Sequence, residues 1–413
     1  MSGPRHPSAS HRAGPGRSSG IIFTSRMNDE IPSDRNLFGL QNRICIKECK
    51  PKVLAMSIGE RIKQARHMRG LNQRELAKGA GVSAQAISKY ERDLDVPGSG
   101  VLIRLSKALG IGIEFFVRPQ KVTKITPIYR EHCSLPRKAE TAILAKIRDW
   151  LEKYLEIEGI LSTDKDEFRF KYPEGFPCRV SSMAEVEQAA VNLRRAWDLG
   201  LDSIENLTGL LEDKGIKVGF VEADNDFDAC TFNAENDGKT VVIITGDNMP
   251  GDRQRLSLAR ELGHLMLEPS GDLDPEKAAY RFAGAFLVPE AIAQFELRDK
   301  RQTLGDYELH MLKDKYGLSM QAWIYRAKDL GILPEERATA IFKKFRSMGW
   351  NLNEPGEPLP SERPMRFDRL VMGALAEGII SEKRATELLG KPLQQFFSEA
   401  AEEHGGWLAA VCN

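Results

Sequence analysis

The chain has 413 residues, of which 41% are hydrophobic and 29% are charged. This composition is ordinary for globular proteins and excludes a fibrous, collagen-like or largely disordered chain. The length exceeds what a single hydrophobic core normally holds, so we expect two or three domains. The sequence has no apolar run long enough for a transmembrane helix and no apolar stretch behind its basic N-terminus. It therefore predicts neither a membrane span nor a signal peptide.

The formal net charge is zero, but the charges are unevenly distributed. Residues 1–118 contain 20 Lys and Arg against 10 Asp and Glu, whereas the rest of the chain contains 39 against 49. A basic front part favours contact with a polyanion there, although charge asymmetry alone is a weak signal. The six cysteines form no CxxC pair, which indicates reduced thiols and a soluble, cytoplasmic protein.

The first segment, residues 1–55, is rich in Ser, Gly, Pro and Arg and shows no hydrophobic period. This predicts a disordered basic tail. Met56 directly precedes the first amphipathic helix. We therefore hypothesise that the natural protein begins at Met56, which the intact mass of the natively expressed protein would test.

Residues 56–118 are predicted to form a domain of short helices separated by glycines. Asn72 and Glu75 have the spacing of a capping box, in which each side chain accepts from the other residue's backbone N–H. Gly81 fits the left-handed position that ends a helix, and Ser83 can cap the next one. The pattern predicts two helices joined by a tight turn.

The second of these helices has one buried and one polar face. Ile87 faces the core, while Gln85, Ser88 and Lys89 face outward. Residues 56–118 carry 11 basic and 6 acidic side chains, which fits a modest nucleic-acid surface. The pattern is typical of a helix-turn-helix, in which the second helix presents polar side chains to base edges. The alternative is a five-helix module that serves only dimerisation or protein contact.

The stretch "NQRELAKGAGVSAQAISKYE" and the following "PGSGVLIRLSKALGI" resemble the Xre family of phage-repressor-like regulators. The resemblance implies binding of double-stranded DNA, as a homodimer on a two-fold operator. It implies two groups of contacts, with phosphates met by Gln73, Ser83, Lys89 and Arg92, and bases approached by Ala84, Gln85 and Ser88.

The connector that follows, residues 119–181, is predicted to hold one long helix from about Leu135 to Ile157, and then a linker over Ser162–Arg179. Residues 182–348 then alternate between helices and strands. Strands are predicted at Lys217–Val221, Cys230–Phe232 and Thr240–Thr245. Helices are predicted at Met183–Leu199, Arg253–Glu268, Pro275–Phe286, Ser319–Leu330 and Glu335–Met348.

The helix "RQRLSLARELGHLMLE" carries an R-E-x-x-H sequence, in which Arg260 and His264 lie one turn apart on the same side. Gly263 in this helix indicates close approach by another backbone. Glu276 opens the next helix, whose alanines favour tight packing. A zincin has H-E-x-x-H instead, where two histidines hold zinc and the Glu activates water. The match is weak by itself, because a Glu and a His three residues apart often arise by chance.

The order of segments over residues 183–345 resembles the ImmA/IrrE family of metallopeptidases, which is often joined to an Xre-type domain. The resemblance implies that Glu261 is the general base and that His264 and Glu276 are two of three zinc ligands. Arg260 occupies the remaining ligand position. A guanidinium has no free lone pair for a metal and carries a positive charge, so we expect a degenerate site without zinc. We expect Arg260 to pair instead with Glu276 or Glu261.

Two alternatives keep a metal at this site. A histidine from elsewhere in the chain (His132, His310 or His404) could supply the missing ligand, although no spacing points to one. A partner could also complete a weak site. Either alternative would restore zinc as a cofactor.

The sequence thus predicts an α+β protein that is predominantly α. Its parts are a tail (1–55), an all-α helix-turn-helix domain (56–118), a helical connector and linker (119–181), a zincin-like domain with a small β-sheet (182–348) and a helical C-terminal extension (349–413). Within the extension, Ser381 is a fair N-cap for a helix ending near Gly390. The extension is expected to cap the preceding domain.

Three functions follow from these features. The leading hypothesis is a transcriptional repressor whose metallopeptidase-like domain senses a protein or small-molecule signal. The second is an active zinc metalloendopeptidase that cleaves a repressor. The third is an antitoxin-like protein that binds a partner through its acidic half. Arg260 distinguishes the first hypothesis from the second, because an arginine in a ligand position disfavours the zinc that an active peptidase needs.

Overall fold

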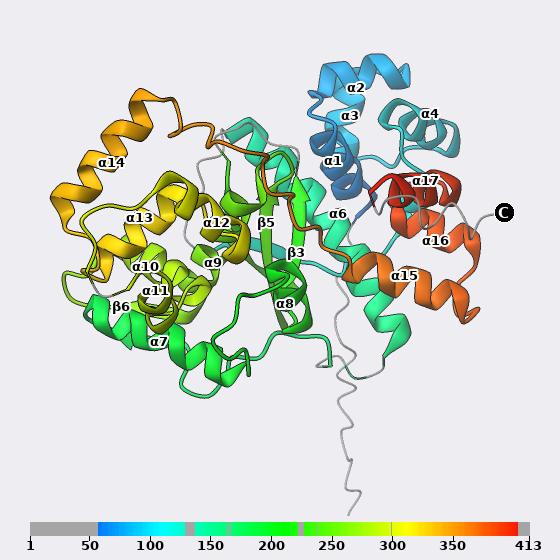
Figure 1. The fold of residues 1–413 in the computed structure, drawn as a ribbon. Coiled ribbons are helices and arrows are strands. Elements are labelled where there is room, and N and C mark those ends of the chain that lie inside the picture. The colour runs from blue at the N-terminus through cyan, green and yellow to red at the C-terminus, as the bar shows by residue number, and fades with distance from the viewer. Residues whose placement is uncertain are drawn as a thin grey trace, which may run out of the picture. The chain divides into compact units, whose positions relative to one another are not determined.

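The computed structural model describes residues 57–128, 137–162, 164, 167–221, 227–236, 238–298 and 300–403. The predictions for residues 1–55, for the start at Met56 and for His132 and His404 lie outside these residues. The described chain is mostly helical, with a small mixed sheet, so the predicted fold class is confirmed (Figure 1).

Five helices form the N-terminal domain, namely α1 (Ile58–Met68), α2 (Gln73–Ala80), α3 (Ala84–Glu91), α4 (Ser99–Leu109) and α5 (Glu114–Val117). The capping box is confirmed, because the Asn72 side chain accepts from the N–H of Glu75 and the Glu75 carboxylate accepts from the N–H of Asn72. Gly81 has a φ of 62°, which makes the left-handed turn between α2 and α3. Ile87 is fully buried. These local contacts determine where α2 ends and where α3 begins.

Four strands form the main sheet in the order β1-β4-β5-β3, namely β1 (Lys124–Pro127), β3 (Lys217–Val221), β4 (Ala229–Asn236) and β5 (Gly238–Gly246). β1 pairs with β4, and β4 with β5, in antiparallel fashion, whereas β3 and β5 are parallel. The three predicted strands are confirmed, and β4 is longer than predicted. The edge strand β1 lies in the segment expected to be a helical connector. It is short and ends in proline, so its sequence carries little strand signal.

Both faces of the sheet are covered. Along β5, Val241 and Ile243 pack into the main hydrophobic core, whereas Val242 and Ile244 pack into a second cluster with α6 (Arg137–Leu161). Successive side chains of a strand point to opposite faces, so this alternation places α6 on one face of the sheet and the main core on the other. The sheet is therefore a central layer between helices (Figure 1).

Eight helices supply the main core around the sheet, namely α7 (Met183–Ala196), α8 (Leu207–Asp213), α9 (Gly251–Met266), α10 (Pro275–Leu287), α11 (Glu290–Leu297), α12 (Asp306–Tyr316), α13 (Met320–Asp329) and α14 (Glu335–Ser347). Five of them match the helices predicted for this part of the chain, and α8, α11 and α12 are additional. Trp323 is fully buried in this core.

The prediction of a linker over Ser162–Arg179 was wrong for its second half. β2 (Cys178–Val180) pairs in parallel with β6 (Leu267–Pro269), and Phe170 and Phe176 pack against the main core. The two prolines and the polar composition suggested a loose segment. The backbone partner that orders it lies almost 90 residues further along the chain, where no local pattern can indicate it.

Three helices form the C-terminal extension, namely α15 (Arg366–Ala376), α16 (Glu382–Leu389) and α17 (Leu393–Glu403). Ser381 accepts from the N–H of Arg384, and Gly390 adopts a left-handed φ of 72°, so both predicted ends of α16 are confirmed. Val371 and Ala374 of α15 form a small core with Ile157 of α6. The helices of the extension therefore pack on α6, whereas the segment before α15 contacts the main-core domain through Trp350 and Glu362.

Candidate DNA interface and degenerate metal centre

Helix α3 presents a polar surface to solvent. Ser83, Gln85, Lys89 and Arg92 are exposed, whereas Ala84 and Ser88 are partly buried. The Ser83 hydroxyl accepts from the N–H of Ala86 and thereby caps α3. Short and long polar side chains along the exposed face of a helix, here from the N-cap Ser83 to the C-cap Arg92, are what contact with base edges and phosphates requires.

A buried ion pair connects α1 with α3 and reaches Gln73. The Arg66 guanidinium binds both carboxylate oxygens of Glu91, at 2.6 and 3.0 Å. Gln73 donates from Nε2 to Oε2 of Glu91 at 2.8 Å. Glu91 therefore fixes the position of the Gln73 amide group, and Arg66 in turn fixes the position of Glu91. The Arg66–Glu91 ion pair was not predicted, because its two residues are 25 positions apart in the sequence.

The second site lies between α9 and α10. Helix α9 supplies Arg260, Glu261 and His264, and the first turn of α10 supplies Glu276. Arg260 donates from Nη1 to Glu276 at 2.7 Å and from Nη2 to Glu261 at 2.9 Å. Nε2 of His264 lies 3.0 Å from Oε2 of Glu276. The structure thus brings together all four residues singled out from the sequence.

Close packing of the two helices sets this geometry. A Cβ placed on Gly263 would lie 3.2 Å from both the Cα and the carbonyl oxygen of Ala279 on α10. Ala279 is almost fully buried. Only glycine lets the α9 backbone come so near to α10, and this approach brings Glu276 within reach of Arg260 and His264. The close approach predicted at Gly263 is confirmed.

Glu261 and Arg260 have further neighbours that the sequence did not reveal. Thr231 of β4 donates to Oε2 of Glu261 at 2.6 Å. Burial raises the pKa of Glu261, and the nearby Arg260 and Thr231 oppose this rise. Burial works to lower the pKa of Arg260, but the carboxylates of Glu261 and Glu276 and the nearby Tyr280 outweigh it and raise that pKa. The guanidinium also lies over the ring of Tyr280, 5.5 Å from its centroid.

This donor set does not fit zinc. A guanidinium offers hydrogen-bond donors only, and Arg260 directs them at Glu276, the expected zinc ligand, and at Glu261, the expected general base. Within the described parts of the chain, no group of three or more His, Cys, Asp or Glu side chains is arranged to hold a metal ion. Nε2 of His310 on α12 lies 3.8 Å from Oδ2 of Asp314, one helical turn further along.

Among the helices that the structure describes, none combines the length and the apolar composition needed to cross a membrane.

Comparison with known proteins matches two parts of the chain to families. Residues 62–116 match a family described as helix-turn-helix, and residues 212–328 match one described as the IrrE N-terminal-like domain. The chain is 34% identical over 67 residues to an uncharacterized HTH-type transcriptional regulator, y4wC, of Sinorhizobium fredii, covering 16% of this chain and 47% of that protein.

Two further relatives are similar over stretches of comparable length. The HTH-type transcriptional regulator ImmR of Bacillus subtilis is 32% identical over 69 residues, which are 17% of this chain and 54% of ImmR. The HTH-type transcriptional regulator PuuR of Escherichia coli is 38% identical over 64 residues, which are 15% of this chain and 35% of PuuR. The chain thus spans about half of these relatives or less.

A solved structure, ComR from Streptococcus suis, aligns over 86% of this chain and 93% of its own. Its TM-score is 0.14 at 10% identity, which is too low to support a conclusion about the fold. The two family matches lie on separate parts of the chain: α1 to α5 are similar to the helix-turn-helix family, and the segment from α8 to α13 is similar to the IrrE N-terminal-like domain.

Proposed function

We propose that the protein is a sequence-specific DNA-binding transcriptional regulator, and specifically a repressor that acts as a homodimer in the cytoplasm. The observation that carries this proposal is the exposed polar face of α3, where Gln85 and Lys89 extend from a helix anchored by a buried core. We assign phosphate contacts to Gln73, Ser83, Lys89 and Arg92, and base contacts to Ala84, Gln85 and Ser88.

Two further observations support the proposal. The relatives that match this part of the chain carry the name of HTH-type transcriptional regulators. Residues 1–118 are basic while the rest of the chain is acidic, so the field of the protein favours approach of DNA at the helix-turn-helix domain. We take residues 56–118 as this domain and residues 182–348 as the IrrE-like domain.

We further propose that the IrrE-like domain is a sensor for a protein or small-molecule signal and not a working peptidase. Arg260 takes the position of a zinc ligand and ties up Glu261, the residue that would have to activate water. An arginine at this position disfavours the metalloendopeptidase hypothesis. The two carboxylates already pair with the guanidinium, so they attract a metal cation less strongly. Zinc would enter the site only if a third ligand replaced this side chain.

Selection of binding sites from a random double-stranded DNA library with the full-length protein tests the proposal. A sequence-specific homodimer should enrich one short motif, repeated with two-fold symmetry at a spacing of about one helical turn. Its affinity should fall steeply with rising salt, since phosphate contacts release counterions. Recovery of unselected sequences, or no retention of DNA at low salt, would contradict the proposed function.

A further inference from the structure

We propose that Glu152 of α6 is the centre of a releasable electrostatic latch, which docks the helix-turn-helix domain on α6 and so couples its position to the rest of the protein. Only the effect on DNA binding rests on the function proposed above. The latch itself rests on the contacts between α1, the segment after α5, and α6.

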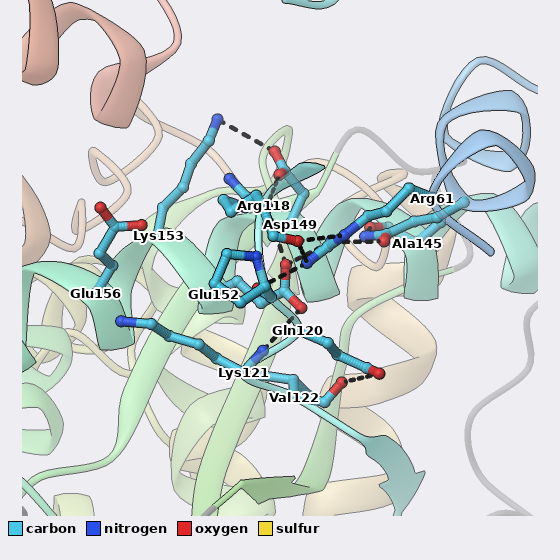
Figure 2. A network of polar contacts seen from close by, with 12 residues as sticks. Arg61, Arg118, Gln120, Lys121, Val122, Ala145, Asp149, Glu152, Lys153 and Glu156 are labelled. Carbon is cyan, nitrogen blue, oxygen red and sulfur yellow. Dashed lines mark hydrogen bonds and ion pairs between the residues drawn. The ribbon is translucent and has the colours of Figure 1, made fainter. Parts of the chain in front are cut away.

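Arg61 of α1 makes the first half of the latch. Its side chain is fully buried, and Nη1 donates to Oε2 of Glu152 at 2.7 Å. The remaining donors bind the carbonyl oxygens of Arg118 and Pro119, at 3.0 to 3.2 Å. Figure 2 shows Arg61 reaching from α1 to the acidic side chains of α6. Gln64, one turn further along α1, donates to the carbonyl oxygen of Ala145.

Arg118, just after α5, makes the second half. Its Nη2 donates to Asp149 at 2.6 Å and to Glu152 at 2.9 Å, so two guanidinium groups share one buried carboxylate. Lys153 also binds Asp149, at 3.1 Å. The ring of Phe115 lies 5.3 Å from the guanidinium carbon of Arg61 and equally far from that of Arg118. Glu152 is therefore the carboxylate on which the charge balance of this junction depends.

No apolar core crosses the junction within the described residues. The hydrophobic cluster of the helix-turn-helix domain consists of residues between Ile58 and Phe116 only. Most apolar side chains of α6 belong to two other clusters, one with the sheet and one with α15 and α16, whereas the small side chain of Ala145 is buried outside both. The domain can therefore leave α6 without opening its own core. Polar interfaces between domains are the kind that permit relative movement.

Helix α6 is also where other parts of the protein meet. Ile147 and Leu151 pack against the sheet, while Glu156 forms an ion pair with Arg384 of α16. Asp149, Glu152 and Glu156 follow one another at helical spacing, so the ion pairs to the two ends of the chain share one stripe of α6. A movement of the C-terminal helices or of the sheet would thus act directly on α6, the helix that carries the acidic side chains of the latch.

Because its ion pairs are buried, the latch is sensitive to the loss of any one charged partner. An intact pair contributes little net stability, because desolvation offsets the attraction, but removal of one partner leaves a buried charge without compensation. The residues of α3 proposed to contact DNA take no part in the latch as described. Docking therefore leaves the recognition face open and fixes its orientation.

Hydrogen–deuterium exchange of the full-length Glu152→Gln variant tests the latch. The substitution keeps the side-chain volume and removes the charge opposite Arg61 and Arg118. We expect the amides of residues 118–123 to exchange at least about tenfold faster, while those of α2 and α3 change less than about twofold. Unchanged exchange at residues 118–123 would overturn the proposal.

Glu235→Gln is the matched control. Glu235 pairs with Lys124 at 3.9 Å, and both side chains are more than half exposed. Its backbone oxygen accepts from the N–H of Thr123, so the variant alters a carboxylate next to the same segment. Exposed ion pairs contribute little, and we expect less than about twofold change in exchange.

Arg61→Lys serves as a second variant, in case Glu152→Gln loosens the whole fold. Lysine keeps the positive charge opposite Glu152 but cannot bind both carbonyl oxygens of Arg118 and Pro119. A local acceleration at residues 118–123 of about threefold or more is expected. If Arg61→Lys shows either no acceleration or acceleration everywhere, the latch is contradicted.

Binding to the DNA sequence selected by the wild type provides the functional measurement. Glu152→Gln should bind it about fivefold more weakly, because a released domain must be ordered again on binding. Equal affinity of the two proteins would show that the latch does not act on DNA binding. If the wild type selects no sequence, the proposed function fails, while the exchange experiment still decides on the latch.

Discussion

Arg260 of α9 lies with its Nη1 2.7 Å from Oε1 of Glu276 on α10, and the other oxygen of the same carboxylate lies 3.0 Å from Nε2 of His264. Glu276, the residue that the family resemblance implies as a zinc ligand, is thus held by an ion pair with Arg260. Arg260 also pairs with Glu261, so one guanidinium offsets the charges of both carboxylates. We expect the present role of this site to be structural or sensory.

Arg260→His should create a zinc site. The imidazole would stand one turn from His264 with Glu276 opposite, which gives the three protein ligands typical of catalytic zinc. We expect about one zinc per chain by elemental analysis of protein purified without chelators. Arg260→Gln is the control, because it removes the guanidinium without adding a ligand, and it should stay free of zinc. Stoichiometric zinc in the wild type would refute the degenerate site.

Gln85→Ala should weaken binding to the selected DNA sequence and relax the preference at one base pair. A bidentate contact between an amide and a base is worth about 1–3 kcal/mol, or roughly 5- to 150-fold in affinity. Fluorescence anisotropy with labelled duplexes measures this. Gln188→Ala, on the exposed face of α7, is the matched control and should bind like the wild type. A Gln85→Ala variant with full affinity and preference would exclude this residue from base recognition.

Lys89→Ala should act differently, because a phosphate contact carries no sequence information. We expect a uniform loss of affinity across related DNA sequences and a salt dependence whose slope falls by about one. Titrations at several salt concentrations separate this from the effect of Gln85→Ala. A loss confined to one base position would instead place Lys89 at a base edge.

Gly263→Ala should lower the free energy of unfolding by about 1–3 kcal/mol, because the added methyl group meets the backbone of Ala279. Alanine normally favours a helix over glycine by about 1 kcal/mol, so the expected sign is opposite to helix propensity. Gly373→Ala in α15 shows the ordinary effect, since nothing lies within 4 Å of its added Cβ. Urea denaturation of both variants gives the comparison, and a stabilised Gly263→Ala would contradict the packing described.

Glu212 is expected to make stability depend on pH. Its Oε2 accepts from the N–H groups of Met365 and Arg366 at the start of α15, and its carboxyl group is buried. Burial raises the pKa of Glu212 from 4.5 to about 7. The folded state therefore holds its proton more tightly than the unfolded state does. This contribution to stability is complete below about pH 4.5 and is lost as the pH rises through about 7.

Glu212→Gln should remove this dependence, because the amide oxygen can still accept from both N–H groups and carries no charge. We expect the variant to be more stable than the wild type by about 1–3 kcal/mol at pH 8 and nearly equal to it at pH 5. Denaturation curves at both values measure the difference. A variant that is less stable at pH 8 would show that the charged carboxylate is the form that the fold prefers.

The sequence by itself determined the elements whose signals lie within a few residues. Asn72, Glu75, Gly81 and Ser83 mark helix ends through contacts that span four residues or fewer, and the structure confirms them. The spacing in R-E-x-x-H likewise placed Arg260 and His264 on one face of a helix. Such features are readable because a helix turn fixes which neighbours can meet, whatever the rest of the chain does.

The tertiary structure alone decided which distant groups meet. Glu152 lies 91 residues from Arg61, Thr231 lies 30 residues from Glu261, and β1 pairs with a strand more than 100 residues away. No local pattern encodes these partners, because each is chosen by the packing of α6, the sheet and the main core as a whole. Helix α3 could thus be predicted from residues 72–92, whereas the attachment of its domain to the rest of the protein could not.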